Sequence, residues 1–486
     1  MARVMSAGAH SEGAIARNVL PFLLPAVVSI YVGVLAYAYY FHRWGIARHH
    51  LETGWMWFVA VLLIYGLSTR STSVAPSHAV QPLHPLIVCA FVFAAVVLYF
   101  PALSVGFLSD DFVLARLAAQ NEFLGGSWEF FRPLPVLGFK LAGAHPMVLH
   151  SAIIMLHGAN AALVAALAAA AGQSPAAAGV AGALFLTFPA HAEAVAWCSG
   201  LQDVLMTTGV LTAVALANAA RERLALPALA GALLSKETAV VAPVLLWLFN
   251  PRRWRVALYG LGIVAGYAAW RVLALPPAAG YASAPSLYKL KELLVRPFAA
   301  LTVPLRTSVV TAWPWLGTAL VCGLLLLLLR AAWSWRGHRP EVFRAVVLAL
   351  SVLVSIAPVY SLFDVSPSLQ GARYLYLPAA AWSVFIASLV MPTRSRLNVL
   401  LAGLLLFASA AGLRVNLRPW NAAARTRDDL VAQVVRARQS GCTTVWVRNV
   451  PDSVDGAYVF RNGLQDAVAP IIVAPSAPPS CWLTWP

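Results

Sequence analysis

Long apolar runs recur along the chain as far as residue 415, and they constrain its fold more than any other feature. Most are long enough, or nearly so, to cross about 30 Å of hydrocarbon as a helix. Residues 224–249 are interrupted by Ser235, Lys236 and Glu237, and form either one span or a hairpin of two short ones. We therefore expect an all-α polytopic membrane protein with about 12 or 13 transmembrane helices. The other predicted spans lie near residues 18–41, 55–68, 84–107, 146–171, 176–190, 203–220, 256–275, 313–333, 343–362, 374–391 and 397–415.

The composition excludes a soluble globular chain. Hydrophobic residues make up 60% of the sequence and charged residues only 11%, whereas soluble proteins have about half and about a quarter. The 34 Lys and Arg outnumber the 18 Asp and Glu, which in a soluble chain would suggest a nucleic-acid partner. The sequence shows no basic face of that kind, so we expect no nucleic acid and attribute the excess to membrane anchoring.

Basic connections set the expected orientation. With the N-terminus inside and residues 224–249 taken as a hairpin, the cation-rich connections become cytoplasmic. These connections are residues 221–223, 252–255, 330–344 and 394–396. Arg43 and Arg48 would then lie outside, against the rule. Acidic residues concentrate in the opposite connections, so we expect the chemistry on the extracytoplasmic face of a bacterial inner membrane.

Composition also divides the chain into three regions. Residues 1–83 carry the first spans, residues 84–415 form the main membrane domain, and residues 416–486 lose the apolar runs. The last region combines a plausible helix with strand-like segments, which predicts a small extracytoplasmic α/β domain. Cys442 and Cys481 lie in it and either form a disulfide or remain two free thiols.

Asp110 and Asp111 stand directly beyond the third predicted span, in the sequence SDDF. Adjacent carboxylates repel each other and are costly to desolvate, so they call for a cation, a proton relay or a substrate hydroxyl. The alternative is a solvated loop acid or a helix N-cap, with Ser109 or Asp110 capping a helix that begins at Phe112.

A second polar segment, FPAHAEAVAWCSGLQD, carries His191, Glu193, Gln202 and Asp203. His191 and Glu193 diverge on a helix but can reach one pocket from an extended turn. Their spacing is not that of a zinc-binding helix. A single His at the end of a span is more often an interfacial residue than a catalyst, but the topology places this one on the same side as the acid pair.

Cations in outer or intramembrane positions form the third candidate group: Arg132, Lys236 and Arg373. A charge in an apolar context is expensive and should be paired or contact an anion. Lys236 either neutralises Glu237 or binds a phosphate. Arg373 either pairs with Asp364 or binds a phosphate. The sequence has no Walker A loop, dinucleotide-binding glycine motif, zinc-protease motif or C-x-x-C pair, so an activated lipid-linked donor would have to supply the energy.

Five segments in order resemble a known family. They are SDDF, FRPL, LFLTFPAHAEAVAWCSGLQDVL, LLSKETAVVAPVLL and ARYLYLPAAA, between residues 84 and 391. They resemble the membrane portion of the transmembrane and tetratricopeptide O-mannosyltransferases, and more broadly the GT-C class of glycosyltransferases. The resemblance implies a GT-C-like bundle that transfers a sugar, with inversion, from a polyprenyl-phosphate donor to a hydroxyl of a protein or glycan acceptor outside the cytoplasm.

The resemblance also suggests roles for individual residues. Asp110 or Asp111 would be the general base, and the other acid would position the acceptor or a divalent ion, so the metal requirement stays unknown. On this basis we expect Asp111→Asn to abolish transfer and leave the fold intact. Three departures are Gln202, where the family usually has Arg, Ala372, where it often has Glu, and the missing tetratricopeptide repeats. The donor-binding candidates are Arg132, His191, Glu193, Asp203, Lys236, Glu237, Arg373, Tyr374 and Tyr376.

Two rival functions stay open. A secondary transporter would explain buried charges and broken helices, and predicts a central pocket at mid-bilayer depth. A lipid flippase or a non-catalytic envelope-assembly protein would tolerate the loss of Asp110 and Asp111.

Overall fold

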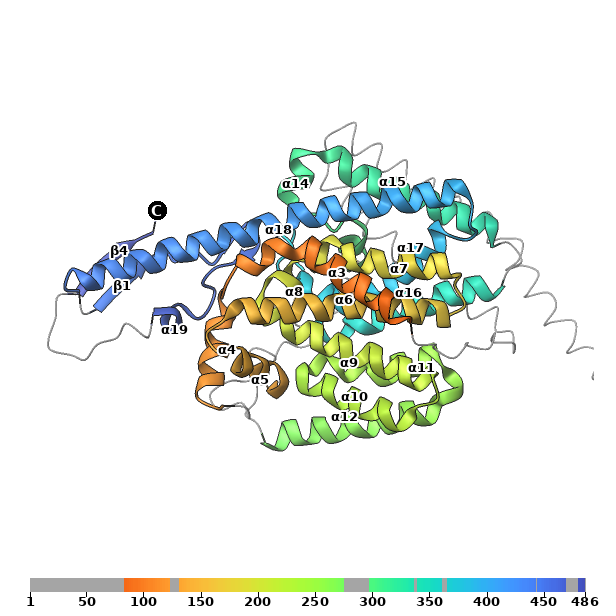
Figure 1. Ribbon diagram of the computed structural model, residues 1–486, viewed down its shortest axis with the longest axis horizontal. Helices are drawn as coiled ribbons and strands as arrows, with labels where there is room; N and C mark the ends of the chain where they lie inside the picture. Colours follow the sequence, from red (N-terminus) through yellow and green to blue (C-terminus); the bar gives the residue numbers. More distant parts are fainter. Residues whose placement is uncertain are drawn as a thin grey trace, which may run out of the picture.

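A computed structural model describes residues 83–122, 131–274, 297–335, 339–360, 365–442, 444–468 and 480–485. The spans expected at residues 18–41 and 55–68, and nearly all of the N-terminal region (residues 1–83), lie outside these ranges. The described chain is mainly helical, and its long helices run roughly parallel to one another (Figure 1).

The long helices of the bundle begin at sequence positions that favour a start. Proline occupies the first position of several of them, where its missing N–H is not needed by the helix. Ser174 caps α7 by accepting a hydrogen bond from the Ala177 N–H, and Ser395 caps α18 in the same way from Asn398. The long helices are α3 (Pro85–Tyr99), α6 (Pro146–Ala170), α7 (Pro175–Thr187), α9 (Leu201–Asn218), α10 (Glu222–Ser235), α12 (Trp254–Ala274), α15 (Pro314–Ser334), α16 (Arg339–Tyr360), α17 (Tyr376–Val390) and α18 (Arg396–Gln439).

Shorter helices and 3-10 turns connect these spans. The short α-helices are α4 (Asp110–Ala119), α5 (Pro133–Ala142), α8 (Ala192–Ala196), α11 (Ala242–Phe249), α14 (Thr307–Ala312) and α19 (Leu464–Val468). The 3-10 turns are Phe100–Ser104, Pro189–His191, Cys198–Gly200, Glu237–Val241, Pro251–Arg253 and Ala372–Leu375. Several of these turns lie where polar sequence motifs interrupt the apolar runs.

Eight helices in the described ranges are long and apolar enough to cross a membrane. A ninth span results if α7 and the following Pro189–Ala196 segment, bent by 42°, are taken together. These correspond to the nine spans predicted between residues 84 and 415. The all-α polytopic class is therefore confirmed for the described chain.

Residues 222–250 form a hairpin of two short helices, as one of the two alternatives predicted. The chain turns at Lys236, which is extended (φ −161°, ψ 136°) between α10 and the 3-10 turn that leads to α11. Asn250 donates a hydrogen bond to the side chain of Asn218 (2.9 Å), and Arg253 pairs with Glu222 (2.7 Å). The start of α10 and the end of α11 therefore lie at the same end of the bundle, with Lys236 at the other.

The basic connections gather at one end of the bundle, which we call the basic end; we call the opposite end, which carries Asp110, the polar end (Figure 1). At the basic end Arg253 pairs with Glu222, Arg344 packs against Gly172, and Arg330 donates to Asn398. The connections expected to be cytoplasmic thus share one end. Which side of a membrane each end faces stays a prediction.

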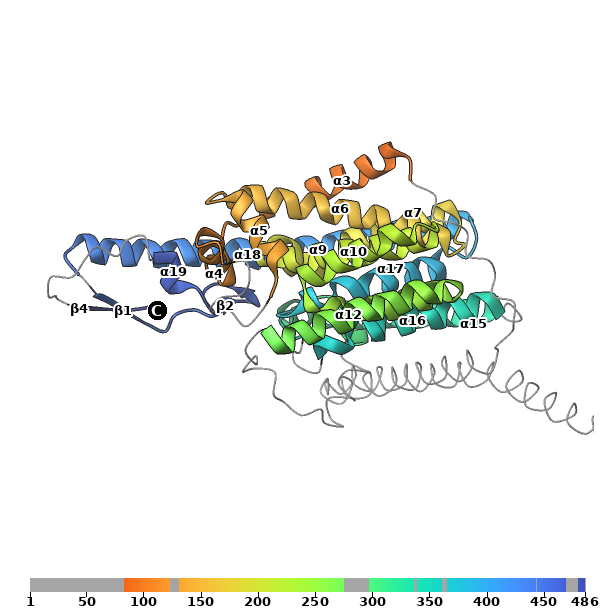
Figure 2. The ribbon, with the colours of Figure 1, turned by 90° about the horizontal axis from the view of Figure 1, so that it is seen from below.

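Helix α17 lies inside the bundle, and nearly all of its residues are buried. Figure 2 shows α3 and α6 on one side of it and α12, α15 and α16 on the other. The outer helices expose large apolar side chains: Leu273 is 86% exposed, Phe407 75% and Phe93 70%. Such exposure is costly in water and ordinary in contact with lipid.

The C-terminal region begins as a continuation of the last span. Helix α18 has 44 residues, which corresponds to about 66 Å, so the expected boundary at residue 416 falls inside it. Beyond α18, strands β1 (Thr444–Arg448) and β4 (Ser480–Thr484) pair in parallel, and β2 (Ser453–Val454) and β3 (Ala457–Tyr458) pair antiparallel. Cys442 and Cys481 form a disulfide. That these elements fold as an independent α/β domain stays a prediction.

Candidate functional site

The acid pair opens helix α4 at the polar end, and its two members have different surroundings. Asp111 is fully buried, and its carboxylate accepts hydrogen bonds from the backbone N–H of Leu108 (2.8 Å) and from the N–H (2.6 Å) and hydroxyl (2.5 Å) of Ser199. Burial raises the pKa of Asp111 to about 8, although these three hydrogen bonds oppose the shift. Asp111 therefore ties the α4 loop to the start of α9.

Asp110 is the more accessible acid of the pair. Its side chain is partly exposed, and Oδ1 accepts a hydrogen bond of 2.6 Å from the Asn462 amide. Ser109 precedes it with φ 50° and ψ −116° and makes no capping hydrogen bond to the helix. Ser109 therefore occupies the N-cap position of a helix that begins at Asp110 instead of Phe112, but its hydroxyl accepts from the Asn462 N–H (3.2 Å) and does not cap the helix.

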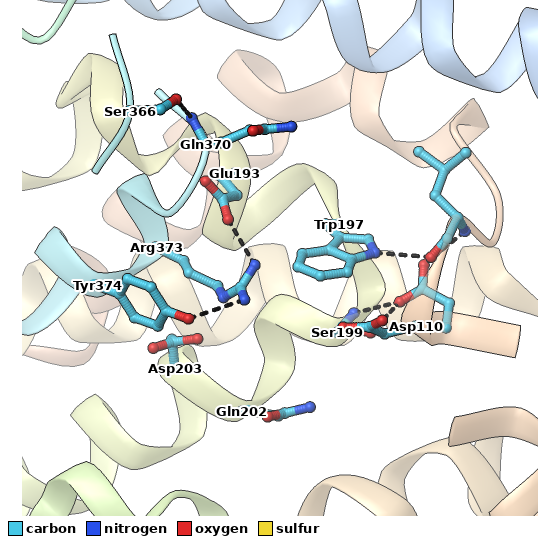
Figure 3. Close-up of polar contacts among 12 residues, drawn as sticks. Asp110, Glu193, Trp197, Ser199, Gln202, Asp203, Ser366, Gln370, Arg373 and Tyr374 are labelled. Atoms are coloured by element: carbon cyan, nitrogen blue, oxygen red, sulfur yellow. Dashed lines mark hydrogen bonds and ion pairs between the residues drawn. The ribbon is translucent and has the colours of Figure 1, made fainter. Parts of the chain in front are cut away.

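Arg373 lies in the 3-10 turn before α17 and pairs with Glu193 of α8. Its Nη1 is 2.7 Å from Glu193 Oε1, and its Nη2 donates to the Tyr374 hydroxyl (3.2 Å), as Figure 3 shows. The guanidinium also lies 4.7 Å from the Trp197 ring centroid and 5.6 Å from that of Tyr458. An aromatic enclosure of this kind favours a cation and fixes its position.

Lys236 pairs with Asp203 in the first turn of α9. Nζ lies 2.6 Å from Asp203 Oδ1, and both side chains are 4% exposed. The ammonium is also 4.8 Å from the Tyr374 ring centroid, and the Arg373 guanidinium is 4.9 Å from the same centroid. Tyr374 thus lies close to two cations that come from different stretches of the chain.

Arg132, at the start of α5, is held by two side chains. It pairs with Glu237 through two hydrogen bonds, one of them 2.9 Å from Nε to Oε2, and it also donates to the Gln202 side-chain oxygen. Gln202 stands where the resembled family has Arg. A second guanidinium there would repel Arg132, whereas the amide oxygen accepts from it.

Each of the three cations is paired with an acid of another segment. Lys236 contacts Asp203 rather than its neighbour Glu237, which pairs with Arg132. Arg373 contacts Glu193, and Asp364 lies outside the described residues. The alternative that Lys236 pairs with Glu237 is wrong, because helix packing brings Asp203 of α9 against Lys236 and Arg132 against Glu237. We call these six residues the charged belt: Arg132, Glu193, Asp203, Lys236, Glu237 and Arg373.

His191 and Tyr376 do not belong to the charged belt. The Tyr376 hydroxyl lies 2.7 Å from Nδ1 of His157, and the rings of His191 and Tyr376 have centroids 4.5 Å apart. Both residues are fully buried, and Phe185 packs against both rings. They form a packing cluster inside the bundle, so the structure does not bring them to the belt as the sequence analysis expected.

Two residues near the belt were missed by the sequence analysis: Trp197 and Tyr458. Trp197 donates from its indole N–H to the Leu108 carbonyl (2.9 Å) and faces Arg373, and Tyr458 packs against Trp197 with ring centroids 4.8 Å apart. Trp197 lies between Glu193 and Asp203 in a segment already singled out. Tyr458 comes from the C-terminal region, and no sequence signal links it to the site.

The sequence analysis left open whether the acid pair holds a divalent ion, and the arrangement of the side chains bears on this. In the portion of the chain that the structure describes, no three or more His, Cys, Asp or Glu groups are arranged to hold a metal ion. Both Asp111 oxygens accept from N–H or hydroxyl donors, and Asp110 Oδ1 accepts from an amide. The acid pair does not provide a ready set of ligands for a divalent ion.

An apolar crevice lies between the spans. Its cavity of about 30 Å³ is lined by residues of α6, α9, α11, α16 and α17, among them Val164, Leu211 and Leu377, and its polar lining residues are Ser351 and Ser355. None of the described residues that line it is charged. The charged belt lies elsewhere, at helix ends and turns of the polar end.

Comparisons with family models, with curated proteins and with solved structures found no match to this chain. The family resemblance therefore stays a prediction from the five sequence segments.

Proposed function

We propose that this chain is a membrane glycosyltransferase. It would move a sugar from a polyprenyl-phosphate donor to a hydroxyl of a protein or glycan acceptor, with its polar end on the extracytoplasmic side of a bacterial inner membrane. The proposal rests on the observation that five sequence segments lie together at the polar end of the bundle. They are the segments around residues 110, 132, 193–203, 236 and 373. These are the segments that carry the family resemblance.

The belt has the charges that a lipid-linked phosphate requires. Buried charges cost several kcal/mol each to desolvate, so a bundle held together by packing alone has little use for three ion pairs. Arg132 and Arg373 present planar forks and Lys236 a point charge, which are the groups that bind phosphate oxygens. We assign them to the leaving polyprenyl phosphate, and Glu193, Asp203 and Glu237 to holding them in place before the donor arrives.

Asp110 is the general base in this proposal. Sugar transfer to a hydroxyl needs a carboxylate that takes the hydroxyl proton as the C1–O bond to the acceptor forms and the C1–O bond to phosphate breaks. Asp110 is partly exposed, whereas Asp111 is enclosed by Leu108 and Ser199. Asp111 therefore positions the loop that carries the base.

The rival functions find less support. A transporter predicts charges at mid-bilayer depth, whereas the belt residues stand at helix ends and turns, and the described lining of the crevice between the spans carries no charge. A flippase or a non-catalytic assembly protein has no use for an accessible carboxylate at the same end of the bundle as three buried cations.

The deciding experiment is a transfer assay on the full chain in lipid nanodiscs. A panel of radiolabelled polyprenyl-phosphate sugars is offered with peptide and glycan acceptors, with and without EDTA, and the label on the acceptor is counted. We expect one donor to support transfer and Asp110→Asn to reduce it by about 100-fold or more. Transport of label across a sealed vesicle without transfer, or full transfer by Asp110→Asn, would overturn the proposal.

A further inference from the structure

A C-terminal segment docks on the start of helix α4, beside Asp110. We call residues 451–466 the cap; they follow β1 and lie within the stretch of chain closed by the disulfide between Cys442 and Cys481. Phe460 of the cap stacks on Phe112, and Asp466 pairs with Arg116 (2.9 Å). The cap thus contacts helix α4, which the acid pair opens, although more than 300 residues separate them in sequence.

Two backbone contacts bind the cap to Ser109. The Ser109 N–H donates to the Val459 carbonyl (2.9 Å), and the Asn462 N–H donates to the Ser109 hydroxyl (3.2 Å). Ser109 has φ 50° and ψ −116°, which an L-residue rarely adopts. A strained conformation persists only where the surroundings hold it, and at Ser109 the cap supplies both of those contacts.

The next residue along the chain is also held by the cap. The Asn462 side-chain amide donates to Asp110 Oδ1 at 2.6 Å, so this hydrogen bond engages one of the two carboxylate oxygens. Hydrogen bonds to an ionised carboxylate are short and directional. Asn462 therefore sets the orientation of Asp110 as well as the conformation of Ser109.

The cap backbone can lie close to the backbone of Ser109 and Ser368 because the cap has glycine at both contacts. Gly463 has φ 79°, and a Cβ added there would lie 2.4 Å from the Ser109 carbonyl oxygen. Gly456 has φ 85°, and a Cβ added there would lie 2.1 Å from the Ser368 carbonyl oxygen. Both contacts are with backbone, which cannot move aside as a flexible side chain would. A side chain at either position would lift the cap from the bundle.

We propose that the cap completes the active site, with Asn462 as a positioning residue for Asp110. The inference rests on the proposed role of Asp110 as the base. Undocking the cap would release Ser109 from its strained conformation and let the Asp110 carboxylate leave the direction that Asn462 imposes. The chain would then bind its donor at the charged belt without a correctly aimed base.

Gly463→Ala tests docking, and Gly441→Ala is its matched control. Gly441 also has a positive φ, 101°, but an added Cβ there meets nothing within 4 Å. The full chain in nanodiscs is followed by hydrogen–deuterium exchange of the peptide containing Ser109, and by kcat and KM for the polyprenyl-phosphate donor. We expect Gly463→Ala to speed exchange and lower kcat by about 100-fold at a nearly unchanged KM, and Gly441→Ala to do neither.

Asn462→Ala tests the side chain alone, with Gln465→Ala as control, because Gln465 is an exposed amide of the same cap. We expect Asn462→Ala to lower kcat without speeding exchange at Ser109, and Asn462→Gln to recover part of the loss. If the wild type transfers sugar and both Gly463→Ala and Asn462→Ala keep its kcat, the inference fails while the proposed function stands. If the wild type transfers nothing from any donor, the proposed function itself has failed.

Discussion

The ammonium of Lys236 lies 2.6 Å from Oδ1 of Asp203, and both side chains are 4% exposed. Lys236 ends the α10 half of the hairpin, and Asp203 lies in the first turn of α9, so the ion pair fastens the hairpin to the span before it. The other carboxylate oxygen, Oδ2, is buried and accepts no hydrogen bond from the residues that the structure describes. The ion pair is therefore enclosed, and its ammonium also lies over the Tyr374 ring.

Removing one partner of this pair should be costly. Lys236→Ala leaves the Asp203 charge buried without a cation, and we expect a loss of about 3–5 kcal/mol in the free energy of unfolding. The double change Lys236→Met with Asp203→Leu should recover most of that stability, because it removes both charges, but no activity.

The pair of Arg253 and Glu222 at the basic end is the matched control for this experiment. Its side chains are 39% and 37% exposed, so Arg253→Ala should cost no more than about 1 kcal/mol. Unfolding of each variant in detergent gives the comparison. Equal losses for Lys236→Ala and Arg253→Ala would show that burial does not strengthen the Lys236 pair.

Substituting Asp110 should lower activity, whereas substituting Asp111 should lower stability. Asp110→Asn should lower transfer by about 100-fold or more at an unchanged Tm, because the side chain is partly exposed and keeps an oxygen for Asn462. Above about pH 8, where the Asp111 carboxyl is ionised, Asp111→Asn should lower Tm, because its amide must place an NH₂ group against the N–H of Leu108 or of Ser199; a lost buried hydrogen bond costs about 1–3 kcal/mol. This revises the expectation from the sequence that Asp111→Asn leaves the fold intact.

Activity assays and thermal unfolding of the two variants check this separation. Asp428→Asn is a suitable control, because that side chain is 65% exposed on α18. A low Tm for Asp110→Asn with a normal Tm for Asp111→Asn would reverse the two roles.

The pH dependence of stability should identify Asp111. Its pKa is raised by burial from 3.8 to about 8 in the folded protein. Between those values the folded state holds a proton that the unfolded state has released, so stability falls as pH rises and levels off above about 8. The slope contributed by one group is at most about 1.4 kcal/mol per pH unit. Unfolding measured across this window should show the decline in the wild type and a flatter curve in Asp111→Asn; identical slopes would contradict the assignment.

The disulfide should report the side of the membrane on which the cap lies. A bond between Cys442 and Cys481 forms in an oxidising compartment and is rare in the cytoplasm. The sequence has five cysteines, of which Cys89, Cys198 and Cys322 are free. In denatured but unreduced protein from cells, a polyethylene-glycol maleimide should therefore modify three thiols, and all five after reduction.

Cys442→Ser is the control for this labelling, and should show four reactive thiols before reduction. A periplasmic reporter fused after residue 440 should also be active. Five reactive thiols without reduction, together with an inactive reporter, would place the polar end in the cytoplasm and reverse the orientation.

The nine spans between residues 84 and 415 could be predicted from the sequence because long apolar runs have few alternatives in a membrane. The polar residues Ser235, Lys236 and Glu237 allowed the hairpin as one of two alternatives, whereas the bend after Thr187 was not predicted. The partners in the ion pairs could not be predicted from the sequence. Arg373 and Glu193 are 180 positions apart, and no local pattern says which of several acids a given cation will reach.

By itself, then, the sequence determined that the chain is a polytopic helical membrane protein and which segments carry its polar residues, because hydropathy and helix breaking act locally. Only the tertiary structure decided that Tyr376 and His191 pack inside the bundle, that Asp110 rather than Asp111 is reachable, and that residues 451–466 dock on helix α4 beside Asp110. Those outcomes depend on which helix faces meet, and the contacts that set them join residues far apart in the chain.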